Sequence, residues 1–191
     1  VEPDKVLRLT MLLHDVAKPV CITTDEAGQN HFKGHPVKGA DMAKVILRRL
    51  KFDNDTTDRV CRLVRYHDDR PELNARTVRR AMNRIGVENM PALFAVKRAD
   101  TLGQSMYHRQ EKLAYVDSFE RFFQEICAAQ QCVQKKDLAI SGSDLIAMGM
   151  KPGKEIGAVL NELFERVLDE PELNQRDKLL DMAHNLMTRL I

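Results

Sequence analysis

The chain has 191 residues, and its 30 lysines and arginines nearly balance its 28 acidic residues. This length suffices for one sizeable core with a smaller appended unit, while the charge balance excludes a protein that is basic over its whole surface. No stretch approaches the run of about 20 apolar residues that a membrane span needs. The sequence shows no secretion signal, so we expect its four cysteines, which form no C-x-x-C pair, to lie in a reducing, cytoplasmic compartment.

The first part of the chain predicts helices interrupted by one hairpin. β-branched residues on both sides of a turn that contains Gly28 predict a short, irregular hairpin near residues 20–33. Apolar residues at helical spacing predict helix for most of the remainder. The helices expected here cover residues 3–17, a segment from Pro36 to about Phe52, and a segment from Thr56 or Thr57 that continues to His67.

The second part continues the helical pattern. Residues 130–136 are polar and mark a change in composition, so we expect two units, 1–135 and 136–191. The sequence therefore predicts an all-α fold, with a helical bundle followed by a smaller helical unit. The helices expected here are Thr77 to Ile85, Pro91 to about Gly103, Arg109 to Gln131, Leu145 to Met148, Lys154 to near Pro171, and a last one from Gln175.

Several of these helices place histidine or aspartate where burial is expected. His14 and Asp15 end the first apolar run, His35 stands at a helix entrance, and His67 and Asp100 each continue an apolar line. Imidazole nitrogen and carboxylate oxygen together suit a borderline divalent metal, and a shared ion would satisfy all of these buried groups. The alternative is that each is a separate, hydrogen-bonded core residue.

Basic residues at two places are candidates for contacting phosphate. Lys18 follows the His-Asp pair by one turn and offers a compact point charge. Arg80 and Arg84, with Arg76, form a stripe on one side of a short helix, and such a stripe can follow a phosphate backbone. A solvated helix face is the alternative interpretation of that stripe.

The motifs around these residues resemble a known superfamily. The His-Asp pair, the following Lys18, and Asp100 in the stretch RADTLGQ resemble the HD superfamily of metal-dependent phosphohydrolases. The chain is similar, more narrowly, to the HD region and tail of bacterial tRNA nucleotidyltransferases, which include CCA-adding enzymes and poly(A) polymerase relatives. This resemblance covers nearly the whole chain and is carried by Gly34-His35, Ala40 to Ala43, Ile46 to Phe52, Asp137 to Ile146, Met148-Gly149, Lys151 to Gly153, Ile156-Gly157 and Asp169 to Asn174.

The resemblance implies a helical HD domain that binds a divalent metal ion and hydrolyses phosphoesters. The ion, which could be Mg, Mn, Fe, Ni or Zn, would lower the pKa of a bound water, so that hydroxide could attack phosphorus. Asp15 would bridge two ions or orient that water, and Lys18 would contact the substrate phosphate, so these two are the candidate catalytic residues. Matched position by position, the implied metal ligands are His14, Asp15 and Asp100, with His35 and His67 as the extra histidines of two-metal members.

The resemblance also implies a longer parent protein. Members of this family carry a nucleotidyltransferase head upstream, with paired carboxylates for two metal ions. This chain begins at Val1 without a methionine, so we expect a fragment that lacks the head. Members of the HD superfamily also place a first ligand histidine before the His-Asp pair, whereas no histidine precedes His14 in this sequence.

The expected function is a metal-dependent phosphohydrolase that acts on nucleotide or RNA phosphoesters, within a tRNA nucleotidyltransferase-like protein. The expected partner is RNA (tRNA) or a nucleotide, no membrane is involved, and a homodimer through the tail helices is a further expectation. One alternative is a non-catalytic RNA-binding body with a relic HD site, and another is a stand-alone HD protein. Convergence of the five ligands on one point would favour the hydrolase.

Overall fold

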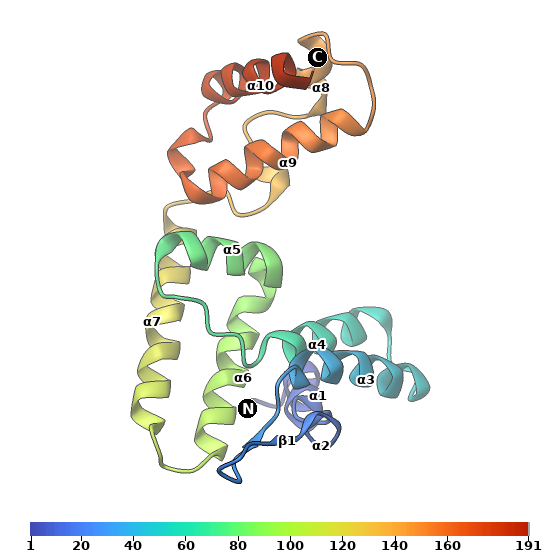
Figure 1. Ribbon diagram of the computed structural model, residues 1–191, viewed down its shortest axis with the longest axis vertical. Helices are drawn as coiled ribbons and strands as arrows, with labels where there is room; N and C mark the ends of the chain where they lie inside the picture. The colour runs from blue at the N-terminus through green and yellow to red at the C-terminus, as the bar shows by residue number, and fades with distance from the viewer. Residues whose placement is uncertain (191) are drawn as a thin grey trace. The chain divides into compact units, whose positions relative to one another are not determined.

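In the computed structural model, which describes residues 1–190, helices make up nearly all of the regular structure (Figure 1). The strands β1 (Thr23–Thr24) and β2 (Asn30–His31) form one antiparallel hairpin. The predicted all-α class and the short hairpin are therefore confirmed. The helices are α1 (Lys5–Leu13), α2 (Lys18–Cys21), α3 (His35–Arg49), α4 (Asn54–Tyr66), α5 (Ala75–Ile85), α6 (Met90–Gly103), α7 (Arg109–Ala128), α8 (Gly142–Ala147), α9 (Lys154–Asp169) and α10 (Arg176–Leu190), with 3-10 turns at Val87–Asn89, Lys135–Asp137 and Pro171–Leu173.

The first helix is shorter than its apolar pattern predicts. It ends at Leu13, and a separate helix, α2, begins at Lys18. Pro19 explains the break, because its ring lacks an N–H group and would collide with the Asp15 carbonyl in a continuous helix. Tighter turns replace the helical hydrogen bonds, with the Val16 N–H donating to the Leu13 carbonyl at 3.1 Å. The His-Asp pair therefore stands in a turn rather than inside a helix.

Contacts between residues divide the chain into two compact units that do not follow chain order. The first unit contains residues 1–72 and 85–121, and the second contains residues 73–84 and those from 122 onward. Most of α5 thus belongs with the C-terminal helices, and α7 contributes to both units. The division into domains at 1–135 and 136–191 stays a prediction.

The core of the first unit holds together the helix ends that carry the predicted ligands. Helix α4 packs against α3, α1 and α6, and α1 also packs against α6. Leu47, Leu63 and Phe94 are fully buried, and each buried side chain of this kind stabilises the fold by about 1.5–3 kcal/mol. Phe94 meets Phe119 edge to face, with ring centroids 5.2 Å apart, which fixes α7 against α6.

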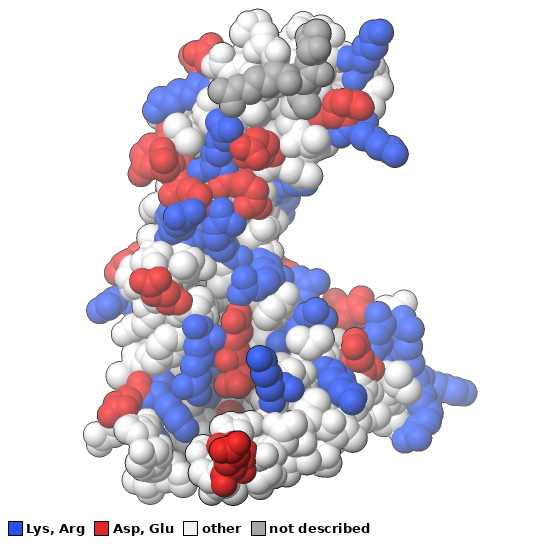
Figure 2. Space-filling view, in the orientation of Figure 1, with Lys and Arg blue, Asp and Glu red and all other residues white. Residues whose placement is uncertain are grey.

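The second unit has its own apolar core and a set of charged contacts at its edge. Leu145, Leu163 and Leu179 bring α8, α9 and α10 together and are fully buried. The buried Arg79 of α5 donates hydrogen bonds to the carbonyl oxygens of Leu168 and Asp169, at 2.7 and 3.0 Å, where α9 ends. Figure 2 shows acidic and basic side chains mixed where α5 lies beside this end of α9. Among residues 1–190, no helix is both long and apolar enough to cross a membrane.

Candidate metal centre

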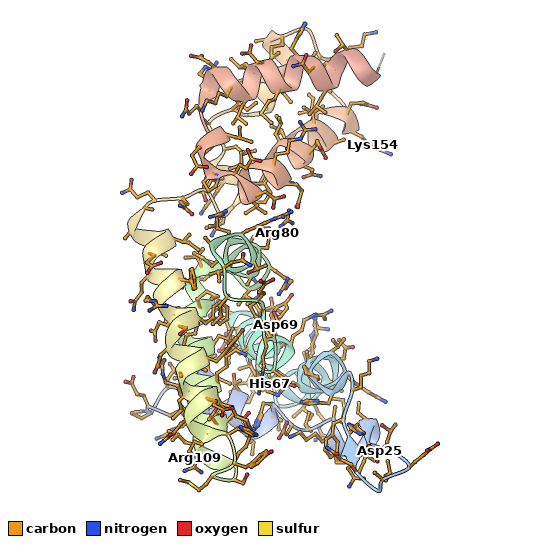
Figure 3. The ribbon with its side chains drawn as sticks, turned by 60° about the vertical axis from the view of Figure 1, so that its left-hand side comes forward. Asp25, His67, Asp69, Arg80, Arg109 and Lys154 are labelled. Atoms are coloured by element: carbon orange, nitrogen blue, oxygen red, sulfur yellow. The ribbon has the colours of Figure 1, made fainter. Side chains whose placement is uncertain are left out.

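Three helix termini and the last turn of α6 bring the five predicted metal ligands together. His14 and Asp15 follow the end of α1, and His35 is the first residue of α3. His67 follows the end of α4, next to Asp69 at the centre of Figure 3, and Asp100 lies near the end of α6. Among the described residues, these five side chains form two groups of metal-capable atoms, Asp15 with His35 and His67, and Asp15 with His14 and Asp100.

Asp15 belongs to both groups because its two carboxylate oxygens face different partners. Oδ1 lies 3.5 Å from His35 Nε2 and 3.7 Å from His67 Nε2. Oδ2 lies 3.3 Å from His14 Nε2, which is itself 3.3 Å from Asp100 Oδ1. An ion with ligand bonds of about 2.1 Å and bond angles of about 90–110° separates its ligand atoms by about 3.0–3.4 Å. Both groups therefore have nearly the spacing that a metal ion requires.

The three histidine rings share one orientation, which is set by local backbone. Each Nδ1 faces the carbonyl oxygen of the residue three positions earlier in the chain. Because a carbonyl oxygen only accepts hydrogen bonds, Nδ1 carries the proton in each neutral ring and Nε2 presents its lone pair to the centre. These contacts join His14 to Met11 at 2.9 Å, His35 to Phe32 at 2.8 Å, and His67 to Val64 at 2.7 Å.

The electrostatics of the cluster fit a cation. The Nε2 atoms of His35 and His67 are 3.2 Å apart, so their lone pairs face each other when both rings are neutral. Burial lowers the pKa of His67, which favours its neutral ring. Asp15 Oδ1 is also buried, and no hydrogen-bond donor reaches it within residues 1–190. A positive ion between these atoms would satisfy all three, and nitrogen with carboxylate oxygen is a donor set that suits a divalent metal.

The second group combines a histidine with two carboxylates. The hydrogen bond to Asp100 raises the pKa of His14, against the opposing effect of burial. Burial acts to raise the pKa of Asp100, but hydrogen bonds from the protonated His14 ring and from Gln104 outweigh it and lower that pKa. The Gln104 amide holds Asp100 Oδ2 at 2.8 Å, which leaves Oδ1 directed at His14. The group therefore has a fixed carboxylate opposite an oriented imidazole.

An open cleft of about 600 Å³ gives access to the cluster. Lys18 projects from α2 into this cleft, where its ammonium group donates to Asp15 Oδ2 at 2.7 Å and lies 5.5 Å from the centroid of the Phe32 ring. The structure thus brings Lys18 to the predicted ligands. Other residues that line the cleft are Asn30, His31, Lys33, Gly34 and Pro36 from the hairpin and the start of α3, and Asp68, Arg70 and Gln104 opposite.

The predicted phosphate contacts Arg80 and Arg84 do not line this cleft. Arg80 donates to Asp169 Oδ1 at 2.8 Å and to Glu165 Oε2 at 2.6 Å, inside the second unit. These ion pairs raise the pKa of Arg80 and describe a structural contact between α5 and α9. A phosphate-binding role for the two arginines stays a prediction.

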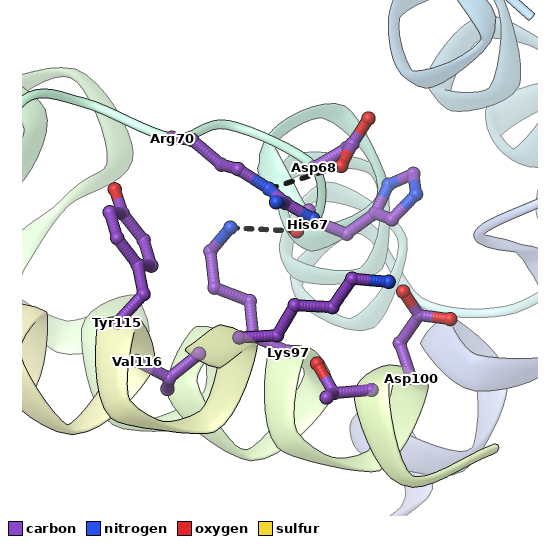
Figure 4. A pocket seen from close by; sticks show the side chains of 9 residues that line it. His67, Asp68, Arg70, Lys97, Asp100, Tyr115 and Val116 are labelled. Carbon is purple, nitrogen blue, oxygen red and sulfur yellow. Dashed lines mark hydrogen bonds and ion pairs between the residues drawn. The ribbon is translucent and has the colours of Figure 1, made fainter. Parts of the chain in front are cut away.

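Sequence reasoning missed Lys97, a buried lysine beside the cluster. Its ammonium group donates to the backbone carbonyls of His67 and Asp69, at 2.8 and 2.6 Å, as Figure 4 shows for His67. Burial lowers its pKa to about 8. A signal was present in the sequence, because Lys97 is four residues after the buried Leu93 and three before Asp100, on the same helical line.

Comparison with protein families gives a match that covers most of the chain. The family model described as tRNA nucleotidyltransferase domain 2 matches residues 37–183. The chain belongs to the tRNA nucleotidyltransferase domain 2 family. The predicted resemblance to bacterial tRNA nucleotidyltransferases is therefore confirmed, whereas phosphohydrolase activity stays a prediction.

Curated relatives agree with this family. The chain is 31% identical over 164 residues to a CC-adding tRNA nucleotidyltransferase from Thermus thermophilus, an alignment that covers 83% of this chain and 35% of the relative. It is 31% identical over 174 residues to an A-adding tRNA nucleotidyltransferase from Deinococcus radiodurans, with 88% and 39% covered. A CCA-adding enzyme from Lacticaseibacillus paracasei is 37% identical over 73 residues, with 38% and 18% covered.

These alignments also show how much of the relatives the chain represents. It spans little more than a third of the length of the Thermus and Deinococcus proteins. No solved structure matches the sequence significantly.

Proposed function

We propose that this chain is the body region of a tRNA nucleotidyltransferase-like protein, and that its histidine–aspartate cluster is a two-metal phosphohydrolase centre for nucleotide or RNA phosphoesters. The observation that carries the proposal is the position of Asp15. One carboxylate oxygen faces His35 and His67, and the other faces His14. A carboxylate shared in this way is suited to bridging two ions a few ångströms apart.

The donor set narrows the choice of metal. His14, Asp15 and Asp100 would hold one ion, and Asp15, His35 and His67 the other. Imidazole nitrogen favours Fe, Ni or Zn over Mg and Ca, which prefer all-oxygen ligands. We therefore expect a transition metal rather than Mg at this centre.

The residues of the chain divide the chemical tasks between them. Bound divalent ions would supply positive charge for the phosphoryl oxygens and acidify a water. Asp15 fixes the separation between the two groups, and the histidine Nδ1–H contacts with backbone carbonyls hold each ring in its orientation. Lys18 lies at the wall of the cleft, where its ammonium group can bind a phosphoryl oxygen of a substrate.

The names of the relatives support tRNA as the partner of the parent protein. They also bear on whether this region chooses the nucleotide that is added. Proteins named for CC addition and for A addition both match over most of the chain. A region that they share is a poor candidate for choosing between the two activities. We therefore place the choice of added nucleotide in the remainder of the parent protein.

The experiment that tests the proposal is a phosphoesterase assay of the purified chain. Nucleoside 2′-, 3′- and 5′-monophosphates, nucleoside 2′,3′-cyclic phosphates and a short RNA would each be supplied with Mn²⁺, Ni²⁺, Zn²⁺ or Mg²⁺. We expect hydrolysis with at least one transition metal and its loss with a chelator. A chain that hydrolyses none of these phosphoesters under any of the conditions would contradict the proposal.

Lys18 provides a sharper test of the same site. We expect Lys18→Ala to lower kcat/KM by about 10²-fold, because one charged contact to the transition state is lost. Lys33→Ala is the matched control, since Lys33 lines the same cleft. Only Lys18 contacts Asp15 in this comparison. Steady-state kinetics of both variants would make the comparison, and equal effects of the two substitutions would argue against a specific role for Lys18.

A non-catalytic RNA-binding body is the second candidate, and one surface favours it. Figure 2 shows basic side chains gathered over the end of α3. Arg48 and Arg49 lie in the last turn of this helix, and both are exposed. Exposed arginines of this kind can bind RNA phosphates in a salt-dependent manner. Binding of tRNA by a chain that takes up no metal would favour this candidate.

A further inference from the structure

Lys97 stands out because a long charged side chain lies inside the first unit. The residue is only 6% exposed, and its ammonium group faces the segment that follows α4. Burying a charge is costly unless polar partners replace the lost water. The partners here are the carbonyl oxygens of His67 and Asp69, at 2.8 and 2.6 Å.

One of these carbonyls, that of His67, belongs to the C-cap of α4, where acceptors are in excess, and the other, that of Asp69, follows two residues later. The last carbonyls of a helix lack intrahelical donors and carry partial negative charge, so an ammonium group there caps the helix. Lys97 therefore connects the end of α4 to α6. The connection is made through the backbone of His67, whose ring faces His35 and Asp15.

The same connection relates the two metal-binding groups to each other. Lys97 and Asp100 are three residues apart on α6 and lie on one face of that helix. His67 belongs to the group with Asp15 and His35, and Asp100 belongs to the group with Asp15 and His14. A small cavity of about 30 Å³, room for one water, adjoins Lys97, His67 and Asp100 together (Figure 4). The lysine is thus placed to fix one group relative to the other.

We propose that Lys97 is a positioning residue for the Asp15–His35–His67 group. By binding the carbonyls of His67 and Asp69, it holds the His67 imidazole in place and so sets the affinity of the ion that this group would bind. The inference rests on the proposed metal centre. It assigns unequal consequences to the two groups, since the hydrogen bonds that orient His14 and Asp100 come from outside the end of α4. His14 is bonded to the Met11 carbonyl and Asp100 to the Gln104 amide, and the His14 ring meets the end of α4 only through an edge-to-face contact with the His67 ring, with centroids 5.1 Å apart.

The test compares Lys97→Met with a matched control in the metal-free chain. Lys112→Met is the control, because Lys112 lines the same cavity but donates to the Gln104 side chain. Two-dimensional ¹H–¹⁵N spectra of the histidine rings report each imidazole separately. In Lys97→Met we expect shifted ring signals for His67 and His35 and faster exchange of the His67 Nδ1 proton. The His14 signals should shift less, since the His14 ring touches His67 only edge to face and keeps its bond to the Met11 carbonyl. Lys112→Met should leave the His67 and His35 rings unchanged.

Cobalt titration of the same proteins tests the consequence for metal binding. We expect the wild-type chain to bind two Co²⁺ ions, and Lys97→Met to weaken one of them by about 10–100-fold while sparing the other. Adding His35→Ala should remove most of this effect, whereas adding Asp100→Asn should preserve it. Lys97→Arg, which keeps a cationic donor, should restore most of the affinity.

The ring spectra and the cobalt titration each have a result that would overturn the positioning role of Lys97. Unchanged His67 signals in Lys97→Met, or equal weakening of both ions, would overturn the positioning role. A wild-type chain that binds no cobalt would instead overturn the proposed metal centre, and the ring spectra would then decide the role of Lys97 on their own. If Lys97→Met does not fold, Lys97→Gln, which is close in length and uncharged, takes its place in both measurements.

Discussion

Asp15→Asn should remove phosphoesterase activity and metal together. The substitution keeps the size of the side chain but removes the negative charge that both donor groups share. We expect kcat/KM to fall at least about 10³-fold, which corresponds to about 4 kcal/mol of lost transition-state stabilisation. Two bound ions would supply more stabilisation than this. Steady-state kinetics with the best metal would measure the loss.

Asp25→Asn is the matched control for this prediction. Asp25 also pairs with a histidine, since its Oδ2 lies 2.8 Å from His31 Nε2, but the pair is exposed on the hairpin. Hydrogen bonds from His31 and from the backbone N–H groups of Gln29 and Ala27 lower the pKa of Asp25. We expect this control to retain its metal content and activity. Retention of both by Asp15→Asn as well would refute the shared role of Asp15.

Arg79→Met should destabilise the second unit by about 2–4 kcal/mol. The guanidinium group of Arg79 is buried and donates to two carbonyls at the end of α9 and to Gln131 Oε1 at 2.9 Å. Methionine fills a similar volume but leaves these acceptors without their donor, and unsatisfied buried acceptors are costly. Denaturant unfolding followed by far-UV circular dichroism would measure the change.

The neighbouring Arg76 offers the control for Arg79. Arg76 makes two hydrogen bonds to the Asp169 carboxylate, both at 2.7 Å, yet its side chain is 61% exposed. Water can replace such contacts, so Arg76→Met should cost less than about 1 kcal/mol. An equal effect of the two substitutions would mean that the ion pairs, and not the buried carbonyl contacts, hold α5 to α9.

Local periodicity singled out His67 and Asp100 as candidate ligands because each of them continues an apolar line. His67 follows Val60, Leu63 and Val64 at helical spacing, and the structure buries it at the end of α4. Asp100 follows Leu93 and Val96 at the same spacing and is half-buried. The period of a helix tells which face is buried, and this is a local property that a sequence expresses directly.

The arrangement of these residues was beyond such reasoning. The division of Asp15 between two donor groups depends on α3, α4 and α6 meeting beside the end of α1, which is a property of long-range packing. Arg79 illustrates the same limit, because its carbonyl acceptors lie 89 and 90 residues further along the chain. The break after α1 was different, since Pro19 was visible and its effect on the preceding turn follows from backbone geometry.

Elemental analysis of the purified chain tests the central claim most directly. The chain would be equilibrated with Mn²⁺ or Zn²⁺, freed of excess metal, and compared with His35→Ala and Asp15→Asn. Because two donor groups share the Asp15 carboxylate, we expect two bound ions in the wild-type chain, one in His35→Ala and none in Asp15→Asn. A wild-type chain without bound metal, or an Asp15→Asn chain that keeps both ions, would contradict a metal centre built around Asp15.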